Sequence, residues 1–209
     1  AYQKSNFTSK DKSFSPLLMI GYNRRFSPLV EKVKNELKLL NQPKSFIYNC
    51  NAGEIGNDHW LNDPLIGGGR LIGEACHFID LLTFLSNSKI SDINCNYLPD
   101  KNPCPESFCL SIKFEDGSIG TINYFSNGCK GYPKENLDIF CSGKIFKIEN
   151  YRKLSIYSGN KKQTIKLWKQ DKGQNKCISE FLKAIKEGKE SPINTEEIFE
   201  IQKFIFEMI

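Results

Sequence analysis

The chain has 209 residues, 39% of them hydrophobic and 25% charged, which is the composition of a folded globular protein with one large domain or two small ones. Its net charge of +5 comes from basic residues that are scattered rather than interleaved with aromatic ones, so nucleic-acid binding is not expected. No apolar run reaches the roughly 20 residues that cross a bilayer, so no membrane partner is expected either.

The first predicted element is a buried strand over residues 17–26, LLMIGYNRRF, which is apolar up to Gly21 and then turns polar. Arg24 and Arg25 follow at the end of this strand. Because ligands bind at the tips of strands in α/β sheets, both arginines are candidate ligand contacts. The alternative is a solvated basic turn, which the two residues alone favour.

A helix and a second strand follow. Ser27 is predicted to cap a helix that has Pro28 at its first position, and an apolar stripe continues the helix to residue 40. Pro43 ends this helix. Residues 44–52, KSFIYNCNA, have the Phe, Ile and Tyr content of a strand.

A long loop over residues 53–69, GEIGNDHWLNDPLIGGG, comes next, and long loops without regular structure are often functional. It contains Trp60 and Asp63 as candidate ligand contacts, although Trp60 fits a plug in the core equally well. Its terminal glycines allow the backbone to approach a ligand closely. They do not match GxGxxG and follow no clear strand, so this chain is not predicted to hold a dinucleotide phosphate by itself.

Residues 66–85, IGGGRLIGEACHFIDLLTFL, are predicted to form the central helix, which is apolar almost all round and therefore buried. Arg70, Glu74 and His77 follow the i, i+4, i+7 spacing and share one face. Charged groups on a buried helix need partners or a cavity. This polar line is therefore the main candidate site in the sequence.

His77 is the candidate catalytic residue of this line, because a histidine that points into a cavity suits general acid–base chemistry. Glu74 or Asp80 would orient the imidazole, and Arg70 would hold an anionic or hydroxylated ligand. The alternative is a histidine that is satisfied within the core. A Cys–His nucleophile is not favoured, because Cys76 is adjacent in sequence and points to a different face.

The chain then changes to a run of strands joined by short turns. Asp116-Gly117 and Gly159-Asn160 are predicted hairpin turns, which indicates a large antiparallel sheet. Lys130 lies in an irregular loop, 127–134, as a weak ligand candidate whose alternative is a solvated lysine. The predicted strands cover residues 90–98, 107–114, 119–126, 136–142, 144–150, 153–158 and 162–168.

Two helices are predicted after these strands. Residues 174–188 form an amphipathic helix with Gly188 as its C-cap. Residues 196–209 form an apolar helix for which Thr195 is the predicted N-cap. The final helix must pack on another element because it is strongly apolar.

The eight cysteines and two histidines do not form a recognisable metal site. There is no CxxC pair, and Cys104 and Cys109 have no matching pair downstream. Residues 1–13 are polar and do not resemble a secretory signal. We therefore expect reduced thiols in a cytoplasmic protein, and no metal.

Several blocks of the sequence, in order, match one enzyme family. They are GYNRRFSP (21–28), DHW…DP (58–64), GGGRLIGEACHFIDLLTFL (67–85), FEDGSIGTINYF (114–125) and KENLDIFCSG (134–143). This order resembles the carboxy-terminal part of the Gfo/Idh/MocA oxidoreductases, which include glucose-fructose oxidoreductase and inositol dehydrogenase. The GGG…HxxD block followed by a strand-rich region is the most specific part of the resemblance.

The resemblance implies an α+β fold, with a large, open, mostly antiparallel sheet and helices packed on one face. It also implies a two-domain enzyme in which an amino-terminal Rossmann domain binds NAD or NADP and supplies a lysine. Residues 1–26 would then be the end of that domain and a linker, and residues 27–209 the substrate-binding and dimerisation domain. Without the missing Rossmann domain, this chain alone is expected to be inactive.

The resemblance also assigns roles to residues. The family histidine falls on His77, and Glu74 is expected to replace the family aspartate, because that position is Gly73 here. Asn23 and Arg24 would lie towards the cofactor. The expected substrate contacts are Arg70, Arg24, Arg25, Trp60, Asp63, Asp80 and Lys130.

Two functions therefore stand beside each other. The first is the substrate-binding part of an NAD(P)-dependent oxidoreductase that acts on a sugar, polyol or nucleotide-sugar hydroxyl. The alternative is a non-catalytic ligand-binding or oligomerisation module of the same fold. A large sheet with one face uncovered by helices needs burial, so a homodimer through the sheet is expected in either case.

Overall fold

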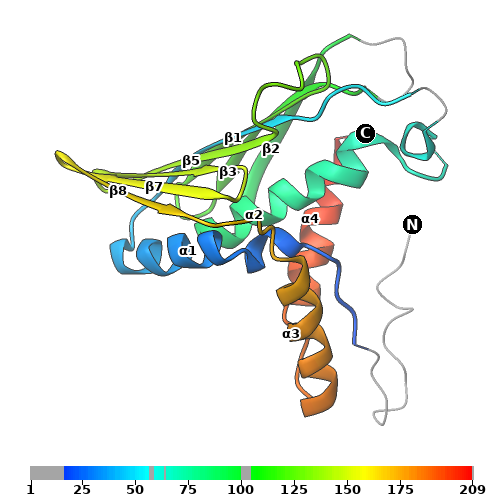
Figure 1. Ribbon diagram of the computed structural model, residues 1–209. Coiled ribbons are helices and arrows are strands. Elements are labelled where there is room, and N and C mark those ends of the chain that lie inside the picture. Colours follow the sequence, from blue (N-terminus) through cyan, green and yellow to red (C-terminus); the bar gives the residue numbers. More distant parts are fainter. Residues whose placement is uncertain (1–16, 57–58, 64, 100–104, 209) are drawn as a thin grey trace.

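The computed structural model describes residues 17–56, 59–63, 65–99 and 105–208. These residues form one eight-stranded sheet with helices against one of its faces (Figure 1). The predicted α+β class, with a mostly antiparallel open sheet and helices on one face, is confirmed. The predictions for residues 1–16 lie outside the described residues.

The strands follow the order β2-β3-β4-β1-β5-β6-β7-β8 across the sheet. All neighbours are antiparallel except β1 and β4, which are parallel. Every strand predicted after residue 43 is present, with ends that differ from the prediction by no more than two residues. The bounds are β1 Ser45–Asn51, β2 Ile90–Tyr97, β3 Phe108–Phe114, β4 Ile119–Phe125, β5 Glu135–Cys141, β6 Lys144–Glu149, β7 Lys153–Ser158 and β8 Lys161–Lys166.

The strand predicted over residues 17–26 is wrong. Residues 17–22 have no regular structure, and Asn23–Phe26 form the short 3-10 helix η2. Tight backbone bonds bend the segment, because the amides of Tyr22 and Asn23 each donate to the carbonyl two residues earlier, at 2.7 Å. No strand among the described residues pairs with this segment, and without a partner its apolar sequence cannot form a sheet.

Four longer helices complete the described fold: α1 (Pro28–Leu40), α2 (Cys76–Ser86), α3 (Gln174–Glu187) and α4 (Thr195–Glu207). Helix α1 begins at Pro28 with Ser27 as its N-cap residue, as predicted, but the Ser27 hydroxyl donates to the Asp171 carbonyl at 2.8 Å and makes no capping bond. Gly188 is the C-cap of α3, as predicted. The N-cap predicted at Thr195 is wrong by one residue, because the Asn194 side chain accepts from the Glu196 amide at 2.7 Å.

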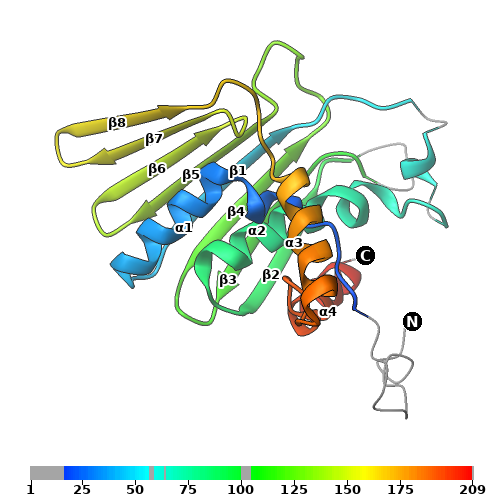
Figure 2. The ribbon, with the colours of Figure 1, turned by 60° about the horizontal axis from the view of Figure 1, so that its bottom comes forward.

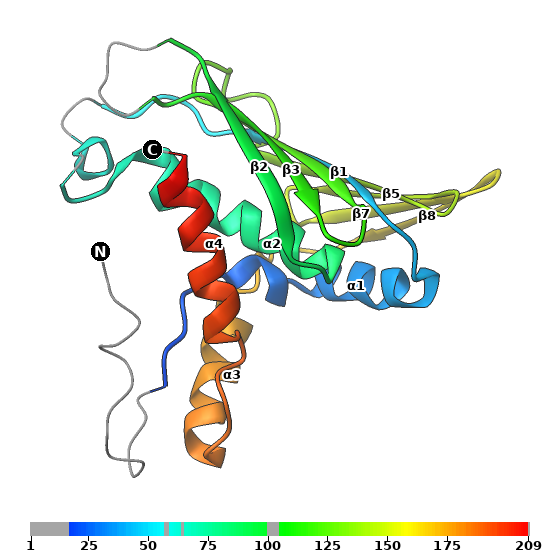
Figure 3. The ribbon, with the colours of Figure 1, turned by 180° about the vertical axis from the view of Figure 1, so that it is seen from behind.

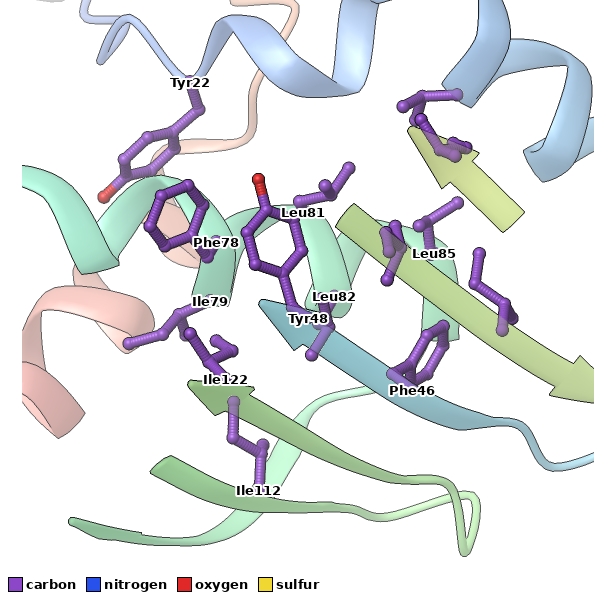
Figure 4. Close-up of a cluster of buried hydrophobic side chains, with 14 of the residues drawn as sticks. Tyr22, Phe46, Tyr48, Phe78, Ile79, Leu81, Leu82, Leu85, Ile112 and Ile122 are labelled. Carbon is purple, nitrogen blue, oxygen red and sulfur yellow. The ribbon is translucent and has the colours of Figure 1, made fainter. Parts of the chain in front are cut away.

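Helix α2 packs against the sheet and supplies much of the hydrophobic core. Its buried side chains, among them Phe78, Ile79 and Leu82, face inward-pointing residues such as Tyr48 and Ile122 of the central strands (Figure 4). The prediction of a buried central helix is thus confirmed. Burying a side chain of this size contributes about 1.5 to 3 kcal/mol.

Two buried lysines stabilise the end of α2. Lys34 of α1 donates to the carbonyl of Phe84, and Lys44 donates to the carbonyl of Ser86 at 2.8 Å. Cations at a helix C-terminus satisfy its free carbonyls and complement the helix dipole. These two contacts fix the C-terminal end of α2.

Helix α4 packs against α2, and the Tyr97 hydroxyl of β2 donates to the Met208 carbonyl at its end, at 3.0 Å, whereas α3 contacts η2 and extends away from the sheet (Figures 2 and 3). Ile198, Ile201 and Ile205 of α4 are buried. Helix α3 instead exposes Ile178 and Leu182. No helix within the described ranges is long and apolar enough to cross a membrane.

Candidate active site

The start of α2 is built on glycines that serve the turn itself. The amides of Gly67 and Gly68 both donate to the Asp63 carbonyl, at 2.9 and 3.0 Å, and the Asp63 carboxylate accepts from the Leu65 amide at 2.8 Å. These glycine amides are therefore already bonded and do not face a ligand. Asp63, a predicted substrate contact, shapes this turn through its backbone and its side chain.

A short segment is seated directly on this turn. A Cβ atom at Gly67 would lie 2.4 Å from the Leu61 Cα, and one at Gly73 would lie 2.4 Å from the Leu61 Cδ1. Only glycine fits at position 67, where the contact is with backbone, whereas a side chain at position 73 would displace the end of the Leu61 side chain. Leu61, in the 3-10 helix η3 (Trp60–Asn62), therefore occupies the space into which a side chain at position 73 would project.

Trp60 does not plug the core. It is 59% exposed, whereas its neighbour Leu61 is 4% exposed. Of the two readings of Trp60, the core plug is therefore wrong, and the ligand contact stays a prediction. The centre of the His59 ring lies 5.7 Å from that of the Trp60 ring, so two aromatic rings lie together at the start of η3.

The chain enters α2 through the π-turn η4 (Leu71–Ala75), where a first polar cluster forms around Arg70. Arg70 is 2% exposed and donates to the Tyr124 hydroxyl at 2.6 Å and to the Gly53 carbonyl at 2.8 Å. Its guanidinium also lies 3.5 Å from the Glu74 carboxylate and 3.3 Å from that of Glu106. The Tyr124 hydroxyl in turn donates to Glu74 at 2.6 Å.

This arrangement confirms that Arg70 and Glu74 lie on one side of the turn, as their spacing predicts. The guanidinium is held inside the protein by several partners, whereas the Glu74 side chain is 32% exposed. The carboxylate, rather than the guanidinium, is thus the group of this pair that reaches solvent.

A second polar cluster surrounds Glu135, whose side chain is fully buried at the start of β5. Arg24 donates two hydrogen bonds to the Glu135 carboxylate, at 2.8 and 3.1 Å, and Lys172 donates one at 2.5 Å. The hydroxyl of Tyr48 also donates to it, and Tyr151 lies 3.1 Å from that hydroxyl. Burial alone would raise the pKa of Glu135, but Arg24 and Lys172 outweigh burial and lower it to about 2.

His77 lies near both clusters. Its ring is half-buried and makes an edge contact with Tyr22, with ring centres 5.7 Å apart. Burial and, after it, the positive charge of Arg24 together lower the pKa of His77 to about 4. The Nδ1 atom is buried without a hydrogen-bond partner among the described residues. His77 is therefore a neutral imidazole at pH 7.

An NMR titration of the imidazole should show this directly. We expect the pKa of His77 to lie near 4, and a His59→Gln variant, which leaves a single histidine, makes the assignment unambiguous. Since the unfolded chain takes up this proton near pH 6.5 and the folded chain does not, the contribution of His77 to stability is lost as the pH falls from 6.5 to 4. A measured pKa of 6 or above would contradict the burial argument.

Arg25 and Asp80 face each other inside the fold. Two nitrogens of the Arg25 guanidinium contact the Asp80 carboxylate, one of them at 3.1 Å, and Glu197 of α4 contacts the same guanidinium at 3.2 Å. Burial raises the pKa of Asp80 to about 6, against the opposing effect of Arg25. The pair joins η2, α2 and α4, while the proposed substrate contacts of both residues remain untested.

The remaining predicted site residues are placed as follows. The Asn23 amide donates to the Lys172 carbonyl at 2.7 Å, so it ties η2 to the segment before α3. Lys130 is exposed, in a loop whose neighbouring carbonyls of Cys129 and Tyr132 accept from the Asn51 amide. Within the described ranges, no group of three or more His, Cys, Asp or Glu side chains is arranged to hold a metal ion.

Sequence reasoning did not find Tyr48, Tyr124, Glu135 and Lys172. One signal was present for two of them. Glu135 shares the inward face of β5 with Leu137 and the alternate residues after it, and Tyr124 continues the inward series of β4. An acid or a tyrosine in phase with core residues indicates a buried polar group that needs a partner.

Residues 31–205 match the family described as "Oxidoreductase family, C-terminal alpha/beta domain", of the Gfo/Idh/MocA group. No curated protein matches the chain by sequence.

Solved structures share this fold. A dehydrogenase from Clostridium difficile is 22% identical, with a TM-score of 0.71 over 91% of this chain and 60% of its own. A UDP-N-acetylglucosamine 3-dehydrogenase from Acidithiobacillus ferrooxidans is 14% identical, with a TM-score of 0.76 over 92% and 60%. A levoglucosan dehydrogenase in complex with NADH and levoglucosan is 17% identical, with a TM-score of 0.77 over 91% and 62%. The chain thus spans about three fifths of the length of these relatives.

Proposed function

Since the chain belongs to the Gfo/Idh/MocA oxidoreductase family as a C-terminal α/β domain, we propose that it is the substrate-binding part of an NAD(P)-dependent enzyme. The substrate would be a sugar, a polyol or a nucleotide sugar that is oxidised at a hydroxyl-bearing carbon. Two structural neighbours, a levoglucosan dehydrogenase and a UDP-N-acetylglucosamine 3-dehydrogenase, act on molecules of this class.

One observation carries the proposal: a neutral, half-buried His77 at the start of α2, three residues after the partly exposed Glu74. Oxidation of an alcohol requires a group that takes the hydroxyl proton. A neutral imidazole accepts a hydrogen bond from that hydroxyl, and developing alkoxide character on the substrate favours protonation of the ring. The Glu74 carboxylate accepts further hydroxyl groups and orients the sugar.

We propose that the described residues do not hold a dinucleotide by themselves. The amides of Gly67 and Gly68 are bonded to Asp63, and the side chains of Asn23 and Arg24 are bonded to Lys172 and Glu135. NAD or NADP, held mainly by a preceding Rossmann domain, would supply the hydride acceptor. In this proposal Asn23 and Arg24 border the cofactor, and Arg70, Arg25, Trp60, Asp63, Asp80 and Lys130 border the substrate.

We propose that residues 1–26 connect this domain to the preceding one and that residues 27–209 form the substrate domain. The end of the connection is already docked, because Arg24 and Arg25 bind Glu135 and Asp80. A cytoplasmic location accords with this role and remains a prediction.

The second function, a module that has lost its chemistry, rests on Gly73. The family resemblance places an aspartate at this position, and Leu61 fills the space in front of it. If Glu74 does not take the role of that aspartate, the domain would bind a ligand or a partner without catalysing a reaction.

The two functions are separated by cofactor binding and turnover. We expect the full-length protein to bind NADH or NADPH in a calorimetric titration, and this chain alone to bind neither. The full-length protein should also reduce NAD or NADP with at least one member of a panel of pyranoses, polyols and UDP-sugars. Full-length protein that binds a cofactor but oxidises no member supports the non-catalytic module, and tight cofactor binding by this chain alone contradicts the domain proposal.

We further propose that the sheet face opposite the helices binds a second copy of the chain. This face is mixed in character, with Ile47, Ile119 and Phe140 exposed around polar residues, and Asn123 donating to Asn49 at 2.8 Å. We expect a dimer in sedimentation equilibrium at micromolar concentration and a monomer for Phe140→Lys. Leu39→Lys, at an exposed apolar residue of α1, is the control that should remain dimeric. A monomeric wild type would contradict the proposal.

A further inference from the structure

Tyr124 is a buried residue of β4 whose ring cannot shift easily. It is completely inaccessible to solvent, and its ring stacks on Phe108 with centres 5.0 Å apart and an angle of 8° between the planes. Its hydroxyl lies beside the π-turn η4 before α2, so Tyr124 connects strand β4 to this turn.

The hydroxyl bridges the two charged residues of the turn. Arg70 donates to it at 2.6 Å, and it donates to Glu74 at 2.6 Å. The direct distance between Arg70 and Glu74 is longer, at 3.5 Å. Tyr124 therefore provides the short contacts of the triad, and both its donor and one of its acceptor sites are used.

The bridge matters because position 73, where the family resemblance places an aspartate, is a glycine here, so Glu74 is the carboxylate that would replace it. The Leu61 Cδ1 occupies the space where a Cβ atom at position 73 would lie. Glu74 is also partly exposed, and a long, exposed carboxylate that was not held would sample many rotamers. A fixed hydroxyl that donates to Oε2 of Glu74 restricts this freedom, while Oε1 lies 3.5 Å from the Arg70 guanidinium and is held less tightly.

We propose that Tyr124 is a positioning residue, which holds the Glu74 carboxylate in one orientation towards the substrate. This inference rests on the proposed function, because it assigns Glu74 a contact with a hydroxylated ligand. Burial raises the pKa of Tyr124 far above its usual range, and the nearby Glu74 raises it further, so the phenol stays protonated and acts as a donor.

The first test needs no ligand. In a double-mutant cycle on this chain, Tyr124→Phe and Glu74→Leu, which removes the acceptor, should show a coupling of about three-fold or more in the folding equilibrium constant, measured by urea denaturation. Tyr151→Phe removes another buried tyrosine hydroxyl, which lies by Tyr48, and should add to Glu74→Leu within about two-fold. Additive effects of Tyr124→Phe and Glu74→Leu would overturn the proposal whether or not the enzyme is active.

The second test separates positioning from a structural role. In the full-length enzyme, Tyr124→Phe should lower kcat/KM for its sugar substrate about 10- to 100-fold, because a displaced carboxylate no longer orients the substrate. In the Glu74→Leu background, which has no acceptor for the Tyr124 hydroxyl, the same change should cost less than about two-fold. An equal loss in both backgrounds would show that Tyr124 does not act through Glu74.

These outcomes distinguish the two proposals. Coupling in the stability cycle together with a full-length protein that binds no cofactor and oxidises no sugar would overturn the proposed function, and the positioning role with it, while the contact itself stands. Activity in the full-length protein without coupling would overturn the role of Tyr124 alone.

Discussion

Replacing His77 with alanine in the full-length protein is expected to lower kcat/KM for sugar oxidation by about 10²- to 10⁴-fold, the usual contribution of a positioned acid–base group. The physical reason is the removal of the proton acceptor. The fold should survive, because the imidazole is half-buried and its Nδ1 atom has no partner to lose among the described residues. The measurement is steady-state kinetics, with thermal unfolding followed in parallel.

A second variant makes this prediction sharper. His77→Gln keeps a side chain that can hydrogen-bond to a hydroxyl but cannot accept a proton at neutral pH. Its kcat should be nearly as low as that of the alanine variant, while its KM stays closer to wild type. Near-normal turnover in either variant would exclude His77 as the proton acceptor, and the non-catalytic module would then be favoured.

The second large effect is expected on stability. Glu135→Gln should lower the free energy of unfolding at pH 7 by about 3 to 5 kcal/mol, the usual cost of breaking a buried ion pair by removing one partner. Glutamine keeps the shape of the side chain, but Arg24 and Lys172 lose the carboxylate that compensates their charges. Urea denaturation measures the loss.

Glu31→Gln is the matched control, because Glu31 forms an ion pair of 2.5 Å with Lys176 on the surface. Both side chains of this ion pair are substantially exposed, so the variant should lose less than about 1 kcal/mol of its free energy of unfolding. A Glu135→Gln variant within that same range would contradict the view that Glu135 organises the buried cluster.

The same carboxylate predicts a dependence on pH. The pKa of Glu135 is about 2 in the fold and 4.5 in the unfolded chain, so its contribution is complete above pH 4.5 and is lost as the pH falls towards 2. At about 1.4 kcal/mol per pH unit this contribution amounts to roughly 3 kcal/mol. The Glu135→Gln protein should lack that part of the acid loss.

Where the prediction from sequence failed, the cause was tertiary. Residues 17–26 have the apolar pattern of a strand, but a strand needs a neighbour, and none of the described strands pairs with them. The sequence did not decide whether Trp60 lies in the core or at the surface, because its loop has no periodicity. In the structure Leu61 is buried instead. Thr195 and Asn194 are both good N-caps, so composition alone could not choose between them.

Local patterns in the sequence were enough to determine the strands after residue 43, the burial of α2 and the shared side of Arg70 and Glu74. Alternation and helical spacing are properties of neighbouring residues, so they survive without knowledge of the fold. The family resemblance drew on the same blocks and gave the α+β class, which the family match then confirmed.

The partners of the charged residues were decided only by the tertiary structure. Arg24 binds Glu135 at a separation of 111 residues, and Arg70 binds Tyr124 at a separation of 54. Such pairs depend on β1 lying between β4 and β5, which brings the inward faces of these strands under the start of α2. A buried charge requires a partner, and the sequence shows that need; only the order of the strands determines which residue meets it.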